Sequence, residues 1–210
     1  MNPAVKRLLL KSRLRPFAGV AYRTIINLEL AALRMLDSLS NPERLPECGG
    51  LEQLTALIKA FERPRTLARL VASIQQHYPG MNILVVDDSR QPKPIPGIEW
   101  LTLPFDSGVS AGRSAGLGHV RTPFTLLLDD DFVFYFGTGL RAALASMVKY
   151  PEIDIMGGTV LKLPLFHKAD YSTIKLYPTT AKPVRPLGGH IGPLPVFDKV
   201  ANFYIAHTER

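Results

Sequence analysis

Three consecutive aspartates, Asp129, Asp130 and Asp131, interrupt an apolar run in the stretch FTLLLDDDFVF. Adjacent carboxylates repel one another, so a cation or hydrogen-bond donors must compensate them. Asp129 and Asp131 are two residues apart at the end of an expected strand, so they could share one divalent cation while the middle residue points elsewhere. Since Mg²⁺ usually takes one or two protein carboxylates and completes its shell with water and phosphate oxygens, the pattern predicts a site for a phosphate-bearing ligand with bound Mg²⁺ or Mn²⁺. The alternative is a solvated turn, which the apolar flanks disfavour.

A second acidic pair, Asp87 and Asp88, follows the apolar run ILVV. Two interpretations stay open: the pair hydrogen-bonds a base or ribose, or it begins an Asx turn with Ser89. Arg113 lies in the Gly-rich stretch SGVSAGRSAGLG, which is expected to open a helix whose N–H groups, together with the guanidinium, could meet a phosphate. That stretch lacks the Lys-Ser/Thr ending of a Walker motif, and helix packing explains its glycines equally well.

Short apolar runs alternate with helical patterns from residue 54 onward. Strands are expected at 54–61, 81–89, 98–105, 123–131, 154–163 and 199–208, and helices at 64–78, 107–120 and 137–151. This alternation predicts an α/β fold with a parallel-type sheet, and in such sheets ligands bind at the carboxyl ends of strands, where both acidic clusters fall. Thr138 is expected to cap the third helix. The Pro- and Gly-rich segment 166–195 is expected to be a long surface excursion near the site.

Residues 1–50 differ from the remainder and are interpreted as a helical arm and linker that precede one domain at 51–210. Apolar residues recur at helical spacing within 20–39. Basic residues precede this helix at Lys6, Arg7, Lys11, Arg13 and Arg15. Peripheral docking on an anionic membrane is one interpretation. Packing on the domain or on a partner chain is favoured, because the basic run and the apolar helix follow one another instead of sharing one helix.

Composition limits the classes of protein that the chain could represent. It has 210 residues, 46% of them apolar, which can fill a sizeable core. The net charge of +7 suits an anionic partner, but no nucleic-acid-binding module is recognisable, so nucleic acid is not predicted as a partner. The single cysteine, Cys48, excludes an intrachain disulfide framework and predicts a reducing compartment, hence a cytoplasmic protein, with peripheral membrane contact as the alternative.

Six stretches, in order along residues 54–208, resemble one known group of enzymes: LIKAFERP, ILVVDDS, LPFDSGVSAGRSAGL, FTLLLDDDFVF, DIMGGTV and VANFYIAHT. The chain resembles the inverting GT-A glycosyltransferases of the family 2 type, and most closely the β-1,4-N-acetylgalactosaminyltransferase group that makes ganglioside-type linkages. The resemblance implies a GT-A fold, which is a Rossmann-like, mostly parallel sheet with flanking helices. The pairing of LLLDDDFVF with ANFYIAHT at this separation is its most specific part.

The resemblance also implies which residues form the site. Asp129 to Asp131 match the DxD motif of the family, with metal ligation by Asp129 and Asp131 and with Asp131 as the direct ligand. The donor-nucleotide site that it implies consists of Lys59, Phe61, Arg63, Asp87, Asp88, Arg113, Asp129 and Asp130. Within that set, Asp87 and Asp88 match the uridine-binding acids. Asn202 falls on the acceptor side.

The implied activity is metal-dependent transfer of a sugar, with inversion, from a UDP-sugar to a glycan or glycolipid acceptor. UDP-GalNAc or a related hexose is the expected donor, and Mn²⁺ or Mg²⁺ the expected cofactor. In the resembling enzymes the general base lies beyond the strand that matches ANFYIAHT, so the base is expected beyond Arg210 and the domain is expected to be incomplete at its carboxyl end. Asp170 and Asp198 remain as substitute bases within the chain, although each falls in a loop-like stretch, so no catalytic residue is assigned. The alternative function is a degenerate or truncated GT-A domain that binds nucleotide-sugar or a partner without catalysis.

Overall fold

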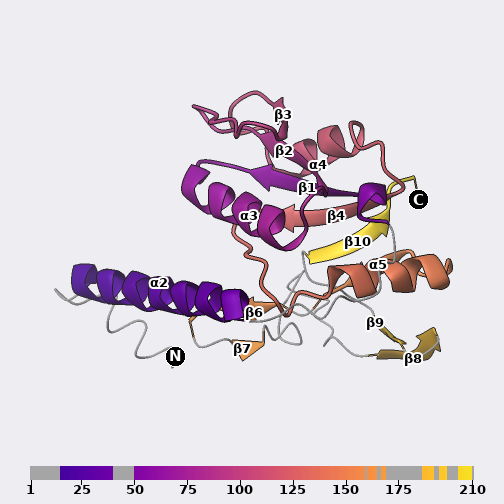
Figure 1. The fold of residues 1–210 in the computed structure, drawn as a ribbon. Helices are drawn as coiled ribbons and strands as arrows, with labels where there is room; N and C mark the ends of the chain where they lie inside the picture. Colours follow the sequence, from indigo (N-terminus) through magenta and orange to yellow (C-terminus); the bar gives the residue numbers. More distant parts are fainter. Residues whose placement is uncertain are drawn as a thin grey trace, which may run out of the picture. The chain divides into compact units, whose positions relative to one another are not determined.

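The computed structural model describes residues 15–39, 50–158, 160–164, 167–168, 186–191, 194–197 and 203–209. These residues divide into two compact units (Figure 1). One unit holds helix α2 (Arg15–Leu39) with the strand pair β6 (Leu161–Lys162) and β7 (His167–Lys168), and the other holds the remaining elements. Asn202, Asp170 and Asp198 lie outside the described residues.

Helix α2 confirms the helical arm that the amino-terminal pattern predicts. It carries exposed apolar side chains, among them Val20, Leu28, Met35 and Leu39. Within the described ranges, no helix has the length and apolar character that crossing a membrane requires. Lys6, Arg7, Lys11 and Arg13 lie outside the described residues, so membrane docking by the arm stays a prediction.

The larger unit is built on a six-stranded sheet with the order β3-β2-β1-β4-β10-β5. Its strands are β1 (Leu54–Ala60), β2 (Asn82–Asp87), β3 (Glu99–Thr102), β4 (Phe124–Asp129), β5 (Ile155–Gly157) and β10 (Phe203–His207). The first four of these are parallel, whereas β10 lies antiparallel to β4 and β5, between them. The predicted mostly parallel α/β sheet is confirmed.

Helices cover both faces of this sheet because its central strands are apolar on both sides. Helix α3 (Pro64–His77) and helix α5 (Leu140–Lys149) bury leucines against one face, where they meet Leu54, Ala56 and Ile58 of β1. Helix α4 (Val109–Leu117) packs on the opposite face, to which Leu57 of β1 points. A short 3₁₀ helix, η1 (Leu51–Gln53), precedes β1. Successive side chains along each strand therefore point in turn to the face covered by α3 and to the face covered by α4.

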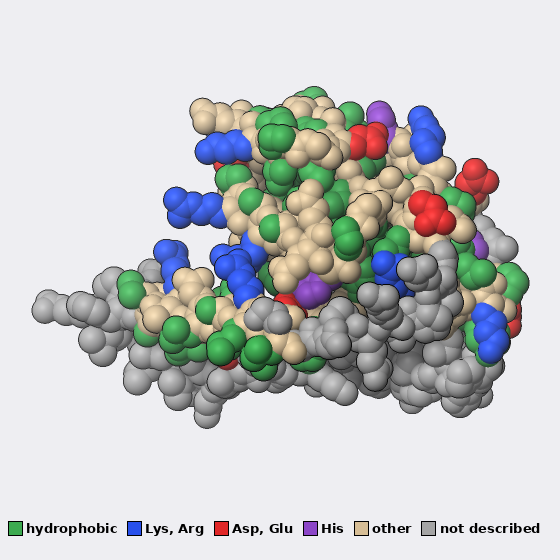
Figure 2. Space-filling view, in the orientation of Figure 1, with side chains coloured by type: hydrophobic (Ala, Val, Ile, Leu, Met, Phe, Trp, Pro, Cys, Tyr) green, Lys and Arg blue, Asp and Glu red, His purple; other side chains and the backbone are tan. Residues whose placement is uncertain are grey.

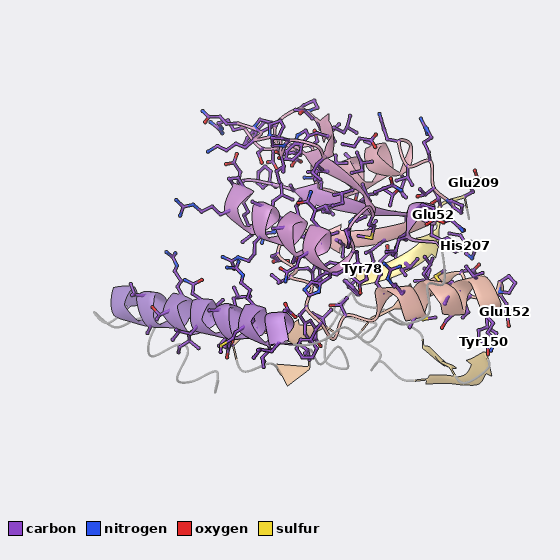
Figure 3. The ribbon with its side chains drawn as sticks, viewed as in Figure 1. Glu52, Tyr78, Tyr150, Glu152, His207 and Glu209 are labelled. Atoms are coloured by element: carbon purple, nitrogen blue, oxygen red, sulfur yellow. The ribbon has the colours of Figure 1, made fainter. Side chains whose placement is uncertain are left out.

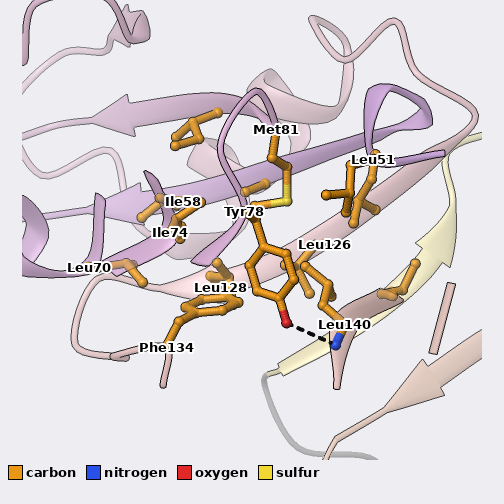
Figure 4. Close-up of a cluster of buried hydrophobic side chains, with 14 of the residues drawn as sticks. Leu51, Ile58, Leu70, Ile74, Tyr78, Met81, Leu126, Leu128, Phe134 and Leu140 are labelled. Carbon is orange, nitrogen blue, oxygen red and sulfur yellow. Dashed lines mark hydrogen bonds between the residues drawn. The ribbon is translucent and has the colours of Figure 1, made fainter. Parts of the chain in front are cut away.

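The ends of α3 and α5 are joined through Tyr78 (Figure 4). Its hydroxyl donates to the carbonyl of Thr138 and accepts the N–H of Leu140 at 3.2 Å. Burial raises the pKa of this hydroxyl, which keeps it protonated as a donor. The prediction that Thr138 caps α5 is wrong: Gly139 is the N-cap residue, and the Thr138 hydroxyl accepts the N–H of Tyr135 at 3.1 Å instead. The Thr138 side chain, which was expected to cap the helix, therefore forms a hydrogen bond within the tight turn over 135–138 instead.

Past α5 the chain follows the predicted elements less closely. The single strand expected at 154–163 is wrong in extent, because the structure has two short strands there, β5 and β6, in different units. Gly157 and Gly158 explain the break, since glycine weakens a strand interior. A Cβ on Gly158 would lie 2.6 Å from Phe203, so the backbone passes directly against that ring. Within 166–195 and beyond it, the described residues include an antiparallel pair, β8 (Pro186–Ile191) and β9 (Leu194–Phe197).

Candidate functional site

Both acidic clusters lie at one edge of the sheet, as the sequence predicted. Strand β1 is hydrogen-bonded to β2 on one side and to β4 on the other, with Ala60 opposite Asp87 and Lys59 opposite Asp129. The ends of β1, β2 and β4, with the loops that follow them, are called the carboxyl edge below. Figure 2 shows Lys and Arg side chains projecting on this side of the unit.

The three aspartates of the triplet make different sets of contacts. Asp129 ends β4 on the α4 face, where its Oδ1 accepts a hydrogen bond from Arg113 Nη2 at 2.9 Å. Asp130 is buried on the α3 side and accepts the N–H of Phe61 at 3.3 Å. Asp131 is exposed, and its Oδ2 accepts from Arg63 Nη1 at 3.0 Å. The middle residue therefore points inward, and the prediction that Asp129 and Asp131 share one cation stays a prediction.

Arg63 bridges two members of the triplet with the two arms of its guanidinium. One arm pairs with Asp131 and the other with the Asp130 carboxylate. Burial lowers the pKa of Arg63, but the attraction of Asp130 and Asp131 raises it by more, so the group stays charged. Burial also raises the pKa of Asp130 above its ordinary value, although Arg63 and the Phe61 N–H oppose that change.

Lys59 and Asp88 form a further ion pair, which is buried on the α4 face. The Lys59 ammonium donates to the Asp88 carboxylate and to the carbonyl of Ala60 at 2.8 Å. The other carboxylate oxygen of Asp88 accepts the N–H of Gly108 at 2.9 Å, and the Asp88 carbonyl accepts the N–H of Asp106 at 3.0 Å. Asp88 thus ties the end of β1 to the turn that begins α4.

Asp87 makes the local hydrogen bond that the Asx-turn interpretation predicted. Its Oδ1 accepts the N–H of Ser89 at 2.9 Å. Ser89 in turn accepts the N–H of Glu62 at 2.6 Å, and the Glu62 carboxylate accepts the N–H of Arg90 at 2.8 Å. Glu62 has a φ of 54°, a conformation that is uncommon for a residue with a side chain and occurs often at functional loops. The loops after β1 and β2 are therefore locked together.

Two glycines of α4 are explained by close packing on β1. A Cβ on Gly112 would lie 2.3 Å from Lys59 Cδ, and one on Gly116 would lie 2.4 Å from Leu57 Cδ1. The packing interpretation of these glycines is confirmed. Because α4 lies this close, it brings Arg113 to Asp129; among the described residues, the buried Nε of Arg113 has no hydrogen-bond partner.

Sequence reasoning missed an aromatic and cationic group beside this edge. The rings of Phe61 and Phe105 lie 5.8 Å apart, and the guanidinium of Arg90 sits 4.4 Å from the centre of the Phe105 ring. Both rings are exposed. Phe61 was in the predicted donor site and Phe105 ended the strand expected at 98–105, but nothing in the sequence indicated that the two rings meet, and nothing marked Arg90.

Several other titratable residues lie away from the carboxyl edge (Figure 3). Glu52 and His207 lie at the opposite end of the sheet, where β1 and β4 begin, since Glu52 precedes β1 and His207 pairs with Phe124. Glu152 follows the end of α5. These residues do not contribute to the site.

The aspartate triplet fits a divalent cation that is held by few protein ligands. In the part of the chain that the structure describes, no three His, Cys, Asp or Glu side chains are grouped to hold a metal ion. Oδ1 of Asp130 is buried and faces the Arg63 guanidinium, and Asp129 and Asp131 are partly exposed. Hard carboxylate oxygens in this number suit Mg²⁺ or Mn²⁺ whose remaining ligands are water and phosphate oxygens.

Comparison with protein families gives one match over this region. Residues 55–169 match the model of the family described as glycosyl transferase family 2. The matched range contains all of β1 except its first residue, then β2 to β4, both acidic clusters, and Arg63 and Arg113, which pair with the triplet.

Curated relatives with similar sequences are named as N-acetylgalactosaminyltransferases. The chain is 32% identical over 163 residues to beta-1,4 N-acetylgalactosaminyltransferase 2 of Mus musculus, which covers 75% of this chain and 31% of that protein. It is 31% identical over 189 residues to beta-1,4 N-acetylgalactosaminyltransferase 1 of Rattus norvegicus, covering 80% and 34%. The chain thus spans about a third of the length of these relatives.

Among solved structures, the crystal structure of S. aureus TarS 1-349 is similar at 15% identity and a TM-score of 0.49. The alignment covers 74% of this chain and 47% of that chain.

Proposed function

The chain belongs to glycosyl transferase family 2, and on that premise we propose that it transfers a sugar from a UDP-sugar to a glycan or glycolipid acceptor. The predicted GT-A type fold agrees with the family and with the mostly parallel sheet. The names of the curated relatives favour N-acetylgalactosamine as the sugar. The observation that carries the proposal is the meeting of three carboxylates and two guanidinium groups at the carboxyl edge.

This charge arrangement suits the departure of a nucleoside diphosphate. Displacement at the anomeric carbon of the donor releases UDP, on which negative charge grows as the glycosidic bond breaks. Arg63 and Arg113 place guanidinium groups beside the triplet, and guanidinium binds phosphate with two parallel hydrogen bonds. These residues are proposed to hold the diphosphate as it leaves.

Asp129 and Asp131 are proposed to hold Mn²⁺ or Mg²⁺, with Asp131 as the direct ligand. When bound, the ion would act as a Lewis acid toward the diphosphate oxygens. Asp130 is proposed to position the site and not to bind the metal, because it accepts the Phe61 N–H and pairs with one arm of the Arg63 guanidinium. It thereby sets the position of the loop after β1 beside the triplet.

The nucleoside is proposed to bind beside the loops that follow β1 and β2. Phe61 is exposed there and is proposed to border the nucleotide. Asp87 is buried and one of its oxygens accepts the Ser89 N–H, so its other oxygen is the proposed partner of the base or ribose. Asp88 and Lys59 lie buried beneath these loops and are engaged with each other. Lys59 and Asp88 are therefore proposed to support donor binding indirectly, by holding these loops in position. Asn202 stays a proposed acceptor-side residue, and no general base is assigned.

Calorimetric titration of UDP into the purified chain, with and without Mn²⁺, tests the donor site. We expect UDP to bind more tightly with Mn²⁺, and Asp131→Asn to weaken metal-dependent binding by about tenfold or more, the loss typical of a contact to a charged group. Glu152→Gln is the matched control, since it removes one exposed carboxylate away from the carboxyl edge and should leave binding unchanged. Equal losses in both variants, or no UDP binding by the folded wild type, would refute the proposed donor site.

Binding without transfer is the competing function. The chain covers about a third of its curated relatives, so a donor-binding portion without the remaining machinery is a concrete alternative. Incubation with UDP-sugars and candidate glycan or glycolipid acceptors separates the two. Release of UDP together with a glycosylated acceptor would exclude binding alone; UDP-sugar binding without either product from any acceptor would favour it.

A further inference from the structure

The arrangement of ion pairs at the triplet bears on how a metal could enter. Every aspartate of the triplet has a guanidinium partner: Arg113 on Asp129, and Arg63 on both Asp130 and Asp131. The two carboxylates proposed to hold the metal each have one oxygen in a hydrogen bond from arginine, at 2.9 Å and 3.0 Å. A metal that approaches these carboxylates therefore meets two positive groups already in place.

Charge balance makes entry of the metal alone unfavourable. Three carboxylates against two guanidinium groups leave one negative charge when all are ionised. Adding a divalent cation would give the cluster a net positive charge of one. The cation would also be repelled by the two guanidinium groups, and this repulsion is stronger in a partly buried site than in water. A diphosphate restores the balance, since it offers anionic oxygens to the metal and to the guanidinium groups together.

Arg63 is the group best placed to give way. Its side chain is 51% exposed, and it pairs with Asp131, which is 53% exposed, whereas the side chain of Arg113 is 23% exposed and extends from a helix packed closely on β1. An exposed pair of this kind contributes little to stability, so exchange of Asp131 for a phosphate partner costs little. Arg63 also immediately precedes Pro64, at the positive end of α3, where an anion is favoured.

We propose that Arg63 occupies the aspartate triplet in place of the metal in the ligand-free chain, so that divalent metal and donor diphosphate bind together. This inference rests on the proposed function, because it takes the triplet as the metal site of a UDP-sugar enzyme. Arg63 opposes the metal alone, and the diphosphate removes that opposition by drawing the guanidinium to its own oxygens. Metal and nucleotide must then strengthen each other's binding by the same factor.

Electron paramagnetic resonance of free Mn²⁺ tests this directly, because it measures metal binding without any turnover. In the wild type we expect Mn²⁺ alone to bind weakly and UDP to tighten its binding by about tenfold or more. In Arg63→Gln we expect Mn²⁺ alone to bind several-fold more tightly than in the wild type, and the tightening by UDP to shrink to a factor of about three or less. Thermal unfolding checks that the variant is folded.

Arg65→Gln is the matched control, because it removes the same charge from an exposed arginine two residues away. Its Mn²⁺ affinity should match the wild type. The inference is overturned if Arg63→Gln binds Mn²⁺ alone no better than the wild type, if Arg65→Gln gains as much as Arg63→Gln, or if UDP that does bind the wild type leaves its Mn²⁺ affinity unchanged. A wild type that binds no UDP refutes the proposed donor site instead, and the Mn²⁺ titrations of the two variants still decide whether Arg63 opposes the metal.

Discussion

Two sets of ion pairs lie at the carboxyl edge, and they differ in burial. The side chains of Lys59 and Asp88 are 5% and 1% exposed, and they are surrounded by backbone groups that satisfy them. Arg63 and Asp131 form a pair in which each side chain is more than half exposed. The first pair connects β1 to the start of α4; the second connects a loop to the proposed metal ligands.

The difference in burial assigns different roles to the two pairs. Breaking a buried pair leaves an uncompensated charge in a medium that solvates it poorly, so such a pair is kept as part of the fold. An exposed pair can exchange one partner for water or for a ligand at low cost. The Lys59–Asp88 pair is therefore a fixed part of the fold beneath the site. The more exposed pair of Arg63 with Asp131 can exchange its partners.

The largest expected effect comes from breaking the buried pair. Lys59→Met keeps most of the side-chain volume but leaves Asp88 buried without its cation, and we expect it to lower the free energy of unfolding by about 3–5 kcal/mol. Urea denaturation followed by circular dichroism measures this change.

Arg63→Gln is the comparison variant: it removes the exposed Asp131 pair and one of the two partners of buried Asp130, which keeps the Phe61 N–H, so we expect a loss smaller than that of Lys59→Met. Adding Asp88→Asn to Lys59→Met should recover part of the loss, because the amide oxygen can still accept the Gly108 N–H while the buried charge is gone. If Lys59→Met and Arg63→Gln cost the same, burial does not distinguish the two pairs.

A smaller effect is expected from the helix that the buried pair supports. In Gly112→Ala the new methyl group would lie 2.3 Å from Lys59 Cδ, so either α4 or the Lys59 side chain must move. We expect a loss of about 1–3 kcal/mol, the range for overpacking a tight contact, together with weaker UDP binding as Arg113 shifts from Asp129.

Gly118→Ala tests whether the loss belongs to that contact. Gly118 ends the same helix, has a helical φ of −63°, and would place its Cβ at an ordinary 3.5 Å from the Ala115 carbonyl. Its stability and UDP binding should stay near those of the wild type. A Gly112→Ala chain as stable as Gly118→Ala would show that α4 does not rest closely on Lys59.

The smallest effect is a pH dependence carried by Asp130. Burial raises the pKa of its carboxyl in the folded chain, so ionisation costs more in the folded state than in the unfolded state. The wild type therefore loses stability relative to Asp130→Asn as pH rises from the ordinary pKa of the group through its raised pKa, and the deficit persists above it. The offset should be smaller than that of Gly112→Ala, because Arg63 and the Phe61 N–H recover part of the cost.

Urea denaturation of both chains from about pH 2.5 to about pH 8, without divalent metal, measures this offset. The two stabilities should converge at the acid end, where the carboxyl is protonated in both states. An Asn variant that is less stable than the wild type at neutral pH, with the gap closing toward acid, would mean that the attraction of Arg63 outweighs burial.

The parallel core of the fold could be predicted because its signals are local. Apolar runs such as ILVV and TLLL, separated by amphipathic helices, give β2, α3 and β4 to within a few residues. The position of β10 between β4 and β5 could not be predicted. Whether a strand lies at the side or in the middle of a sheet depends on which other strands leave backbone N–H and C=O groups unpaired, and the sequence of β10 does not show this. The break of 154–163 into two strands was missed for a related reason, since close contact of Gly158 with Phe203 joins residues far apart in sequence.

The sequence by itself determined which charged residues lie at the carboxyl edge. The three aspartates must end a strand because apolar residues precede them, and parallel strands bring such ends to one edge. Only the tertiary structure decided which residues pair. Lys59 pairs with Asp88, and Arg63 pairs with both Asp130 and Asp131. The guanidinium of Arg90 lies over the Phe105 ring. The reason is that strand pattern depends on neighbours in the chain, whereas an ion pair depends on which loops the sheet order places side by side.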